Sequence, residues 1–403
     1  MAVSTPLITV AEARGRVLDA IRPLPAERLQ IDRALGRVLA EDVNAAGDVP
    51  SFPCSAMDGY AVHAGPAGQR LRIVGESRAG TPSQDSLNPG EAIRISTGAA
   101  VPSGATAVIA QENVTADPET IETGAPTAEG QNIRGPGEDM RAGSEVLSRG
   151  TRLGAVQLGA AVAAGAGSLL VSRRPKVTVL CTGDELRAPG EPLHPGEIHN
   201  SNAPMLTALA AANGAQTAPA QRLPDDRAAT EHGIETALQD SDVVIISGGV
   251  SVGPHDHVKP ALATLGVEEI FWSVALQPGK PTWFGRRGDQ EYVFGLPGNP
   301  VSAVVTHSLF VAPALAGLQG AAAPRPIEAQ AALGVPVRRN RRREQALRVR
   351  LERGGAQTLA FPNGAQGSHI LTSLLGADAL AMIPAGEGTL DAGAEVALEA
   401  LAG

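Results

Sequence analysis

Two glycine-containing segments carry acidic and hydroxyl side chains just after expected β-strands. Residues 181–186 read Cys-Thr-Gly-Asp-Glu-Leu, and residues 247–253 read Ser-Gly-Gly-Val-Ser-Val-Gly. Glycines let a backbone approach a phosphate closely, and carboxylates hold hard cations such as Mg²⁺ between phosphates. Each segment alone is also compatible with a plain turn or a helix cap, but together they predict a phosphate site. The residues that would serve it are Asp184, Glu185, Ser247, Gly248, Gly249, Ser251 and Asp256.

A lysine lies between prolines in residues 277–281, which read Gln-Pro-Gly-Lys-Pro. This residue, Lys280, is one of only three lysines in a chain whose other basic residues are arginines. A rigid loop would hold it as a fixed point charge suited to oxyanions, although a solvated turn lysine is the plain alternative. In the nearby segment 295–300, Pro297 and Pro300 are expected to shape the loop, and Pro300 fits the first position of a helix.

Three further features point less clearly to chemistry. Residues 255–257 read His-Asp-His, but adjacent side chains point in different directions, so a transition metal held by both histidines is not favoured. Five arginines between residues 338 and 343 are more typical of a solvated or partner-facing edge than of a nucleic-acid site. Cys54 and Cys181 form no CxxC pair, and we expect both to be buried apolar residues rather than nucleophiles.

The elements that must position these residues alternate between strands and helices from residue 174 to 323. Strand-like runs lead into both glycine-containing segments, and helices are expected from Asn202 (as N-cap) to Gly214 and over 225–239, 257–265 and 301–318. Alternating strands and helices predict right-handed crossovers and a mostly parallel sheet. Ligands collect at the carboxyl edge of such a sheet, where both segments would lie.

Outside the α/β part, the residue pattern changes between helix-like and strand-like segments. Helical patterns over 10–21 and 29–43 give way to short β-like runs, and a second helical stretch precedes the α/β part. We therefore expect a helical N-terminal subdomain (1–50 and 141–173), a β-rich insert (51–140), an α/β domain (174–323) and a C-terminal β domain (324–403).

Composition limits the classes of function. The net charge of −9 and the 2% aromatic content argue against nucleic-acid binding, which needs a basic face. No apolar signal-peptide core precedes the charged residues of the N-terminus. The stretch 153–171 is long enough to suggest a membrane span, but its many Ala and Gly residues favour a buried helix followed by a short strand. We expect a cytoplasmic protein that has no membrane contact.

Eight motifs occur in an order that resembles one family, the molybdopterin molybdenumtransferases, which include the E domain of gephyrin. They are SAMDGYA, STGAAVP, RGPGEDM, CTGDEL, SGGVSVG, QPGKP, GLPGNPVSA and QGSHILTSL. The resemblance covers essentially the whole chain. The α/β part alone is similar to the wider molybdopterin-binding fold, which adenylyltransferases of the same pathway share, whereas SAMDGYA and the C-terminal part single out the molybdenum insertase.

The resemblance implies a multidomain α/β plus β fold in an elongated protomer of four subdomains. A helical N-terminal part would carry the β-rich insert, a molybdopterin-binding α/β domain would lie at the centre, and a β-barrel-like domain would close the chain. It also implies a homodimer, whose active site lies between the α/β domain of one protomer and the N-terminal part of the other. Other enzymes of the cofactor pathway are further expected partners.

The resemblance implies a reaction and the residues that perform it. Adenylated molybdopterin would lose AMP as molybdate is inserted at its dithiolene sulfurs, with a divalent cation on Asp256 and the Asp184/Glu185 pair. Lys280 and Arg348 would hold oxyanions, and no protein nucleophile is required. The functional acids would be Asp58, Asp139, Asp184, Glu185, Asp225 and Asp256, and the cleft would be lined by Thr97, Lys280, Pro297, Pro300, Arg348 and Ser368.

The chain departs from the family pattern at three places outside the acids of the two strand-end loops. Pro53-Cys54 stands where Asp-Asn is usual, Gln277 where Lys is common, and Gln345-Ala346 where Glu-Phe often precedes the cleft arginine. Two other functions stay open on sequence grounds. One is an adenylyltransferase of the same pathway, and the other is a receptor scaffold, although this chain lacks the long linker and second enzyme domain of that architecture.

Overall fold

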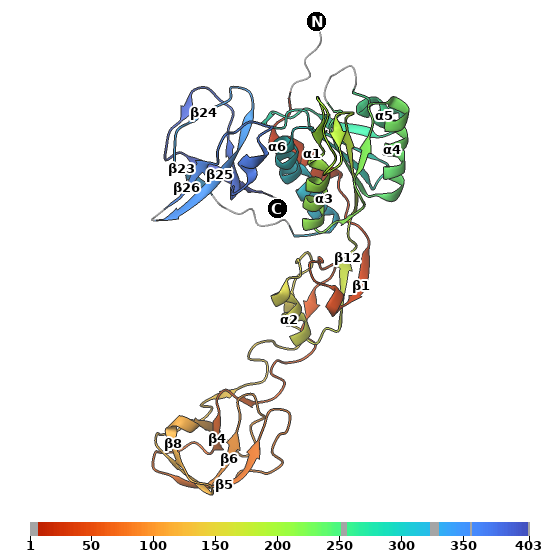
Figure 1. Cartoon of the computed structure of the whole chain (residues 1–403). Coiled ribbons are helices and arrows are strands. Elements are labelled where there is room, and N and C mark those ends of the chain that lie inside the picture. Colours follow the sequence, from red (N-terminus) through yellow and green to blue (C-terminus); the bar gives the residue numbers. More distant parts are fainter. Residues whose placement is uncertain (1–6, 251–255, 323–329, 355–356, 402–403) are drawn as a thin grey trace.

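The computed structural model describes residues 7–250, 256–322, 330–354 and 357–401. Figure 1 shows an elongated chain with a β-rich module at one end and a smaller module containing α2 in the middle. An α/β module and a C-terminal β module lie side by side at the other end. The acids of the N-terminal motifs and those of the strand-end loops therefore belong to parts of the chain that lie far apart.

The α/β module is built on a seven-stranded sheet. Its order is β16-β13-β18-β22-β21-β19, and β17 also pairs with β13. Only β21 runs against the other strands, so the expectation of a mostly parallel sheet is confirmed. The strands are β13 (Lys176–Thr182), β16 (Gln216–Thr217), β17 (Gln221–Leu223), β18 (Val243–Ser247), β19 (Glu268–Trp272), β21 (Trp283–Arg287) and β22 (Glu291–Leu296).

Helices cover both faces of this sheet (Figure 1). Alternate residues of β18 point to opposite faces: Val243 and Ile245 join one apolar core, and Val244 and Ile246 join the other. A sheet buried on both faces explains why this strand reads as a continuous apolar run. The first core contains α1 (Val10–Ala20), α3 (Asn202–Ala212), α6 (Pro300–Thr306), the π-helical segment η3 (His307–Val311) and α7 (Ala312–Leu318), and the second contains α4 (Arg227–Asp240) and α5 (Val258–Thr264).

The helical character expected for residues 1–50 and 141–173 is wrong for most of that sequence. α1 packs into the α/β core, and the helix expected over 29–43 is replaced by short strands. β1 pairs with β12 at a sequence distance of about 140 residues, and β2 pairs with β11. This non-local pairing overrides the helical pattern. The elements of the middle module are β1 (Ala26–Gln30), η1 (Ile31–Arg33), β2 (Val43–Asn44), β11 (Glu145–Leu147), α2 (Ala155–Ala163) and β12 (Ser168–Ser172).

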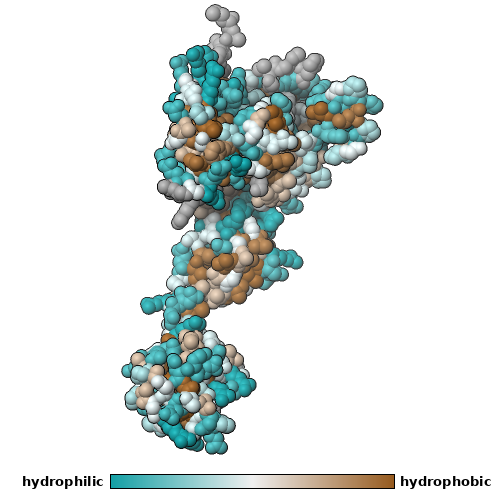
Figure 2. Space-filling view, turned by 60° about the vertical axis from the view of Figure 1, so that its left-hand side comes forward, coloured by the Kyte–Doolittle hydropathy of each residue, from teal (hydrophilic) through white to brown (hydrophobic). Residues whose placement is uncertain are grey.

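The stretch 153–171 forms the expected helix and strand, but the helix is not buried. Only Ala161 of α2 is buried, and the side chains of Val156 and Val162 are 80% and 54% exposed. Figure 2 shows brown, apolar atoms gathered on the middle of the molecule, where Figure 1 places α2. By length and composition, a different helix of the described residues could span a membrane. This helix, Pro300–Leu318, belongs to the α/β core, and 72% of its apolar window is buried.

The β-rich module is a six-stranded sheet with an apolar core on each face. Its order is β7-β4-β6-β5-β9-β8. The strands are β4 (Gly59–Val62), β5 (Arg70–Ser77), β6 (Glu91–Ile95), β7 (Ala107–Ala110), β8 (Val114–Ala116) and β9 (Thr120–Thr123), with η2 at Gln111–Asn113. The short pair β3 (Cys54–Ser55) and β10 (Ile133–Arg134) connects it to the middle module.

The C-terminal module is a closed β-barrel. Its sheet runs β20-β25-β26-β23-β29-β27, and a further pairing of β27 with β25 closes it. Leu380 and Met382 of β27 pack into the α/β core, so the barrel is docked on that module. The elements are β20 (Leu276–Gln277), β23 (Gln330–Leu333), β24 (Val337–Arg338), β25 (Glu344–Gly354), β26 (Gln357–Pro362), η4 (Leu371–Leu374), β27 (Ala379–Ile383), β28 (Thr389–Leu390) and β29 (Glu395–Ala400).

Candidate active site

A cleft of about 860 Å³ opens at the carboxyl edge of the α/β sheet. Three neighbouring strands end there, because Cys181 is in register with Ser247 and Ser247 with Leu296. The loops that follow β13, β18 and β22 therefore meet, as the sequence predicts for parallel strands. Eight of the residues singled out in the sequence line the cleft: Glu185, Asp225, Ser247, Gly248, Gly249, Asp256, Pro297 and Pro300.

Gly248 shows why the second loop needs glycine. Its φ angle is +93°, and a Cβ atom there would lie 2.8 Å from Thr182 Oγ1 and 3.0 Å from the Thr182 carbonyl oxygen. The ends of β13 and β18 can approach each other only because this side chain is missing. The backbone of the loop is thereby presented to the cleft, where a phosphate could lie against it.

Asn202 contributes to the cleft in a role that its place in the sequence does not predict. It was expected to cap α3, but Asn200 performs that function: its Oδ1 accepts the backbone N–H of Ala203. The Nδ2 of Asn202 instead donates to Ser247 Oγ at 2.9 Å and to the Gly298 carbonyl at 2.7 Å. One buried amide thus joins the loops after β18 and β22. The position of Asn202 at the start of α3 suggested a cap, but it does not reveal this long-range partner.

The carboxylates line two sides of the cleft. Asp184 and Asp225 each accept a hydrogen bond from the other's backbone N–H, at 3.3 and 3.4 Å, which fixes the loops after β13 and β17 together. Glu185 and Asp225 line the cleft, and Asp256 lines it with both carboxylate oxygens buried. No group of three or more Asp, Glu, His or Cys residues that could hold a metal ion is present in the described part of the chain. The three-carboxylate set expected from Asp184, Glu185 and Asp256 is therefore not preformed there.

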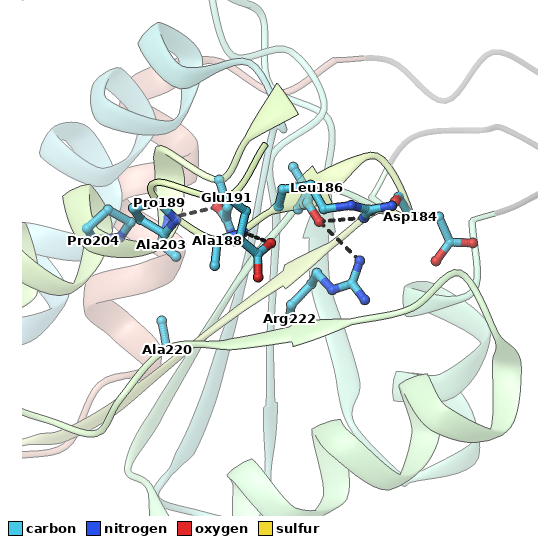
Figure 3. Close-up of a pocket in the computed structure, with 11 residues that line it drawn as sticks. Asp184, Leu186, Ala188, Pro189, Glu191, Ala203, Pro204, Ala220 and Arg222 are labelled. Atoms are coloured by element: carbon cyan, nitrogen blue, oxygen red, sulfur yellow. Dashed lines mark hydrogen bonds between the residues drawn. The ribbon is translucent and has the colours of Figure 1, made fainter. Parts of the chain in front are cut away.

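Asp184 lies in a second pocket of about 520 Å³ that shares Leu186 and Asn200 with the cleft. Figure 3 shows its small apolar residues, Ala203, Pro204 and Ala220, on one side and Arg222 beneath Leu186. One guanidinium nitrogen of Arg222 donates to the Leu186 carbonyl oxygen at 3.1 Å. This pocket adjoins the cleft and is lined by the segment after β13, the start of α3 and Arg222 of β17.

The barrel contributes a loop to the opposite side of the cleft. Ser368 accepts a hydrogen bond from Asn299 Nδ2 at 3.0 Å, and its carbonyl accepts the backbone N–H of Val301. The next residue, His369, lines the cleft. Docking of the barrel therefore brings the motif that contains Ser368 to the site. No local sequence pattern predicts this contact.

Arg348 was expected to line the cleft. It lies behind this loop instead and is fully buried. Its Nε donates to Ser373 Oγ at 3.2 Å, and Nη2 lies 3.4 Å from the carbonyl oxygens of Ala365 and Gly367. Burial lowers the pKa of Arg348 to about 10, so the guanidinium stays charged at neutral pH. Within the described residues no carboxylate forms an ion pair with it. Its positive charge therefore stands close behind Ser368.

The remaining residues that the sequence assigns to the site do not line the cleft in the described part of the chain. Lys280 is exposed beside Pro281, which lines the cleft, and Ser251 and His255 fall outside the described residues. Asp58 lies in the β-rich module, where its Oδ1 accepts the backbone N–H of Thr97 at 2.8 Å. Asp139 lines a separate cavity with Arg134 and Glu138. Within one chain, Asp58, Thr97 and Asp139 are not brought to the α/β cleft.

Cys181 ends its strand beside the cleft but is not equipped as a nucleophile. The side chain is 1% exposed, and burial raises the pKa of its thiol to about 11. The reactive thiolate form is therefore scarce at neutral pH. This agrees with the expectation of a small buried apolar residue.

Comparisons with known proteins agree over the whole length of the chain. Residues 8–165 match the MoeA N-terminal region (domain I and II), residues 178–317 a probable molybdopterin binding domain, and residues 330–401 the MoeA C-terminal region (domain IV). The chain is 36% identical to a molybdopterin molybdenumtransferase of Haemophilus influenzae, with 98% of each chain covered. It is 35% identical to a molybdopterin molybdenumtransferase 2 of Mycobacterium tuberculosis, covering 93% of this chain and 95% of that protein. The crystal structure of the molybdopterin biosynthesis moeA protein from Pyrococcus horikoshii is similar with a TM-score of 0.82 and 31% identity, covering 98% of this chain and all of that one. The chain belongs to the molybdopterin molybdenumtransferase family.

Proposed function

We propose that this protein inserts molybdate into adenylated molybdopterin and releases AMP, in a reaction that depends on Mg²⁺. The observation that carries the proposal is the cleft itself, in a chain of this family. The backbone of Gly248, just after β18, and the carboxylates of Asp225 and Asp256 line one opening. This is the combination that a phosphate-bridged substrate with a hard cation requires.

The donor set of the cleft fits Mg²⁺ only as an ion shared with substrate. Mg²⁺ in phosphate sites is commonly held by one or two carboxylates, with water and substrate oxygens filling its other positions. Asp256 would be its first ligand, and Glu185 or Asp184 would approach from the loop after β13. When bound, the ion would neutralise the bridging phosphates and polarise the phosphoanhydride bond.

The chain's own part in this reaction is to position and neutralise. The backbone around Gly248 would cradle a phosphate, and the neighbouring pocket of Figure 3 has room for one ring system of the substrate. No side chain needs to act as a nucleophile, in keeping with the raised pKa of Cys181. Catalysis of this kind rests on placement and electrostatic complementarity.

Molybdate would bind on the barrel side of the cleft. Lys280 beside Pro281 offers an exposed positive charge, and Ser368 offers a hydroxyl on the docked loop. No carboxylate of the described residues forms an ion pair with the buried guanidinium of Arg348, so its field favours an anion in front of Ser368. We assign Arg348 to this electrostatic role and not to direct contact.

We further propose that the protein works as a homodimer with shared active sites in the cytoplasm. Asp58 and Asp139 cannot serve the cleft of their own chain without a large rearrangement, because their modules lie apart from it (Figure 1). The exposed apolar face of α2, with Val156 and Val162, gives a second copy a surface to cover. A two-fold axis could then bring the N-terminal acids of one protomer to the cleft of the other.

Molybdate-dependent release of AMP from adenylated molybdopterin by the purified protein tests the function. Release should require both molybdate and Mg²⁺, and Asp256→Asn should abolish it while thermal unfolding stays close to that of the wild type. Asp240→Asn is the matched control, because Asp240 is an exposed acid at the end of α4, remote from the cleft. Full activity of Asp256→Asn would remove the metal assignment, and absence of release by the wild type would reject the function.

A further inference from the structure

One indole contacts described residues on both sides of the stretch 251–255, between β18 and α5. Trp272, the last residue of β19, donates its Nε1–H to the carbonyl oxygen of Val250 at 3.1 Å. The ammonium group of Lys259, on the first turn of α5, lies 3.7 Å from the centroid of the same ring. Val250 precedes the stretch 251–255, which lies outside the described residues, and Lys259 follows Asp256 by three positions.

The two contacts are of different kinds and are both partly shielded. The Nε1–H bond is directional and holds the backbone of Val250, whose side chain is 1% exposed and lies against Gly295 of β22. The contact with Lys259 is a cation–π interaction, which strengthens when water is excluded. Lys259 is half-buried, and Trp272 packs against the second apolar core. Trp272, on the edge strand, therefore holds both the residue that precedes this stretch and the first turn of α5.

Asp256 lies between these two contacts along the chain, and its carboxylate oxygens are buried at the cleft. A carboxylate that holds a cation must keep its place to within a fraction of an ångström. We infer that Trp272 is a positioning residue, which holds Val250 and the first turn of α5 and so sets the place of the Asp256 carboxylate between them. This inference rests on the proposed function for the role of Asp256, but its contacts are independent of that role.

The second tryptophan of the chain provides a matched control. Trp283 pairs with Trp272 across β19 and β21, is 2% exposed, and donates its Nε1–H to Glu269 at 2.6 Å. It makes a similar indole hydrogen bond, but to a residue of β19 and not to the loop. Trp272→Phe keeps a ring for Lys259 and loses the N–H, whereas Trp272→Leu loses both contacts. Trp283→Phe loses an indole N–H elsewhere.

The test is the affinity for Mn²⁺ in the presence of AMP, measured from the free-ion signal in electron paramagnetic resonance. Mn²⁺ takes the same oxygen ligands as Mg²⁺, and the measurement needs no turnover. Trp272→Phe should raise the dissociation constant roughly three- to tenfold and Trp272→Leu by more, since each contact contributes on the order of that factor. Trp283→Phe should leave it unchanged. Hydrogen exchange at Val250 and at 256–259 should quicken in the Trp272 variants only.

The possible results separate the inference from the proposed function. Unchanged Mn²⁺ affinity in both Trp272 variants, or an equal rise in Trp283→Phe, overturns the positioning role. A rise confined to the Trp272 variants supports it even when the wild type releases no AMP, a result that would reject only the proposed function. A purely structural role for Trp272 would lower the unfolding temperature without moving Mn²⁺ affinity at temperatures where the variant is folded.

Discussion

The side-chain nitrogen of Asn202 lies 2.7 Å from the carbonyl oxygen of Gly298, so the first residue of α3 holds the loop that follows β22. The same nitrogen also reaches Ser247 at the end of β18. A single side chain thus connects two of the three strand ends that form the cleft. Its removal should disturb ligand binding as well as stability.

Asn202→Leu keeps the size of the side chain and leaves the Gly298 carbonyl without its buried donor. We expect a loss of about 1–3 kcal/mol in the free energy of unfolding and weaker AMP binding. Urea unfolding and calorimetry would measure the two effects. Asn213→Leu is the control, because Asn213 donates to Leu209 at the other end of α3. If both variants bind AMP like the wild type, Asn202 has a structural role only.

Lys280→Ala should weaken the response to molybdate more than the affinity for nucleotide. Loss of a charge-assisted contact costs roughly 1.5–3 kcal/mol, or about ten- to hundredfold in affinity. The quantity to measure is the molybdate concentration that gives half-maximal AMP release. Lys176→Ala serves as control, because Lys176 begins β13 at the opposite edge of the sheet. An unchanged half-saturating concentration would show that Lys280 is a solvated turn residue.

Shared active sites can be tested by mixing two inactive variants. Co-refolding Asp58→Asn chains with Asp256→Asn chains gives heterodimers in about half of the pairs when association is random. In a shared-site dimer, each heterodimer contains one doubly substituted site and one intact site. Roughly a quarter of the wild-type AMP release should therefore return. Heterodimers confirmed by mass but without any activity would show that Asp58 and Asp256 serve the same chain.

His307 should make the fold sensitive to acid. Burial lowers its pKa to about 3, and neither ring nitrogen has a hydrogen-bond partner among the described residues. In the unfolded chain the imidazole of His307 is protonated below its ordinary pKa of about 6.5, whereas in the folded chain it stays neutral. The free energy of unfolding therefore falls as the pH drops from about 6.5 toward 3. The loss should approach about 1.4 kcal/mol per pH unit. Urea unfolding between pH 7 and pH 4 should show this slope, and His307→Leu should reduce it. Parallel profiles for the two proteins would contradict the assignment.

The sequence alone predicts the α/β module because the patterns that mark its strands and loops lie within short segments. The apolar run of β18 and the glycines after it identify a buried strand and its loop, and parallel strands place such loops at one edge. The helix expected over 29–43 was wrong for the opposite reason. β1 forms because its residues meet β12 about 140 positions later, and no local pattern records that partner.

The same limit applies to the site. Asp256, Ser247 and Pro297 were identified because they lie in short motifs next to strand ends. The bond from Asn299 to Ser368 and the burial of Arg348 depend on how the barrel docks, which involves contacts between distant parts of the chain. Sequence patterns can name such residues through a family resemblance, but only the folded chain shows which face the cleft and which lie behind it.

The strand β20 is only two residues long, yet it belongs to one module by sequence and to the other by pairing. Leu276 and Gln277 pair with Glu344 and Gln345 of the barrel, and Lys280 follows three residues later. The barrel is therefore oriented by a direct strand pairing, in addition to the covalent connection that precedes β23. Any rotation of the barrel would pull on the segment that carries Lys280. A displacement of the barrel would therefore act on the segment of Lys280 and on the loop of Ser368 at the same time.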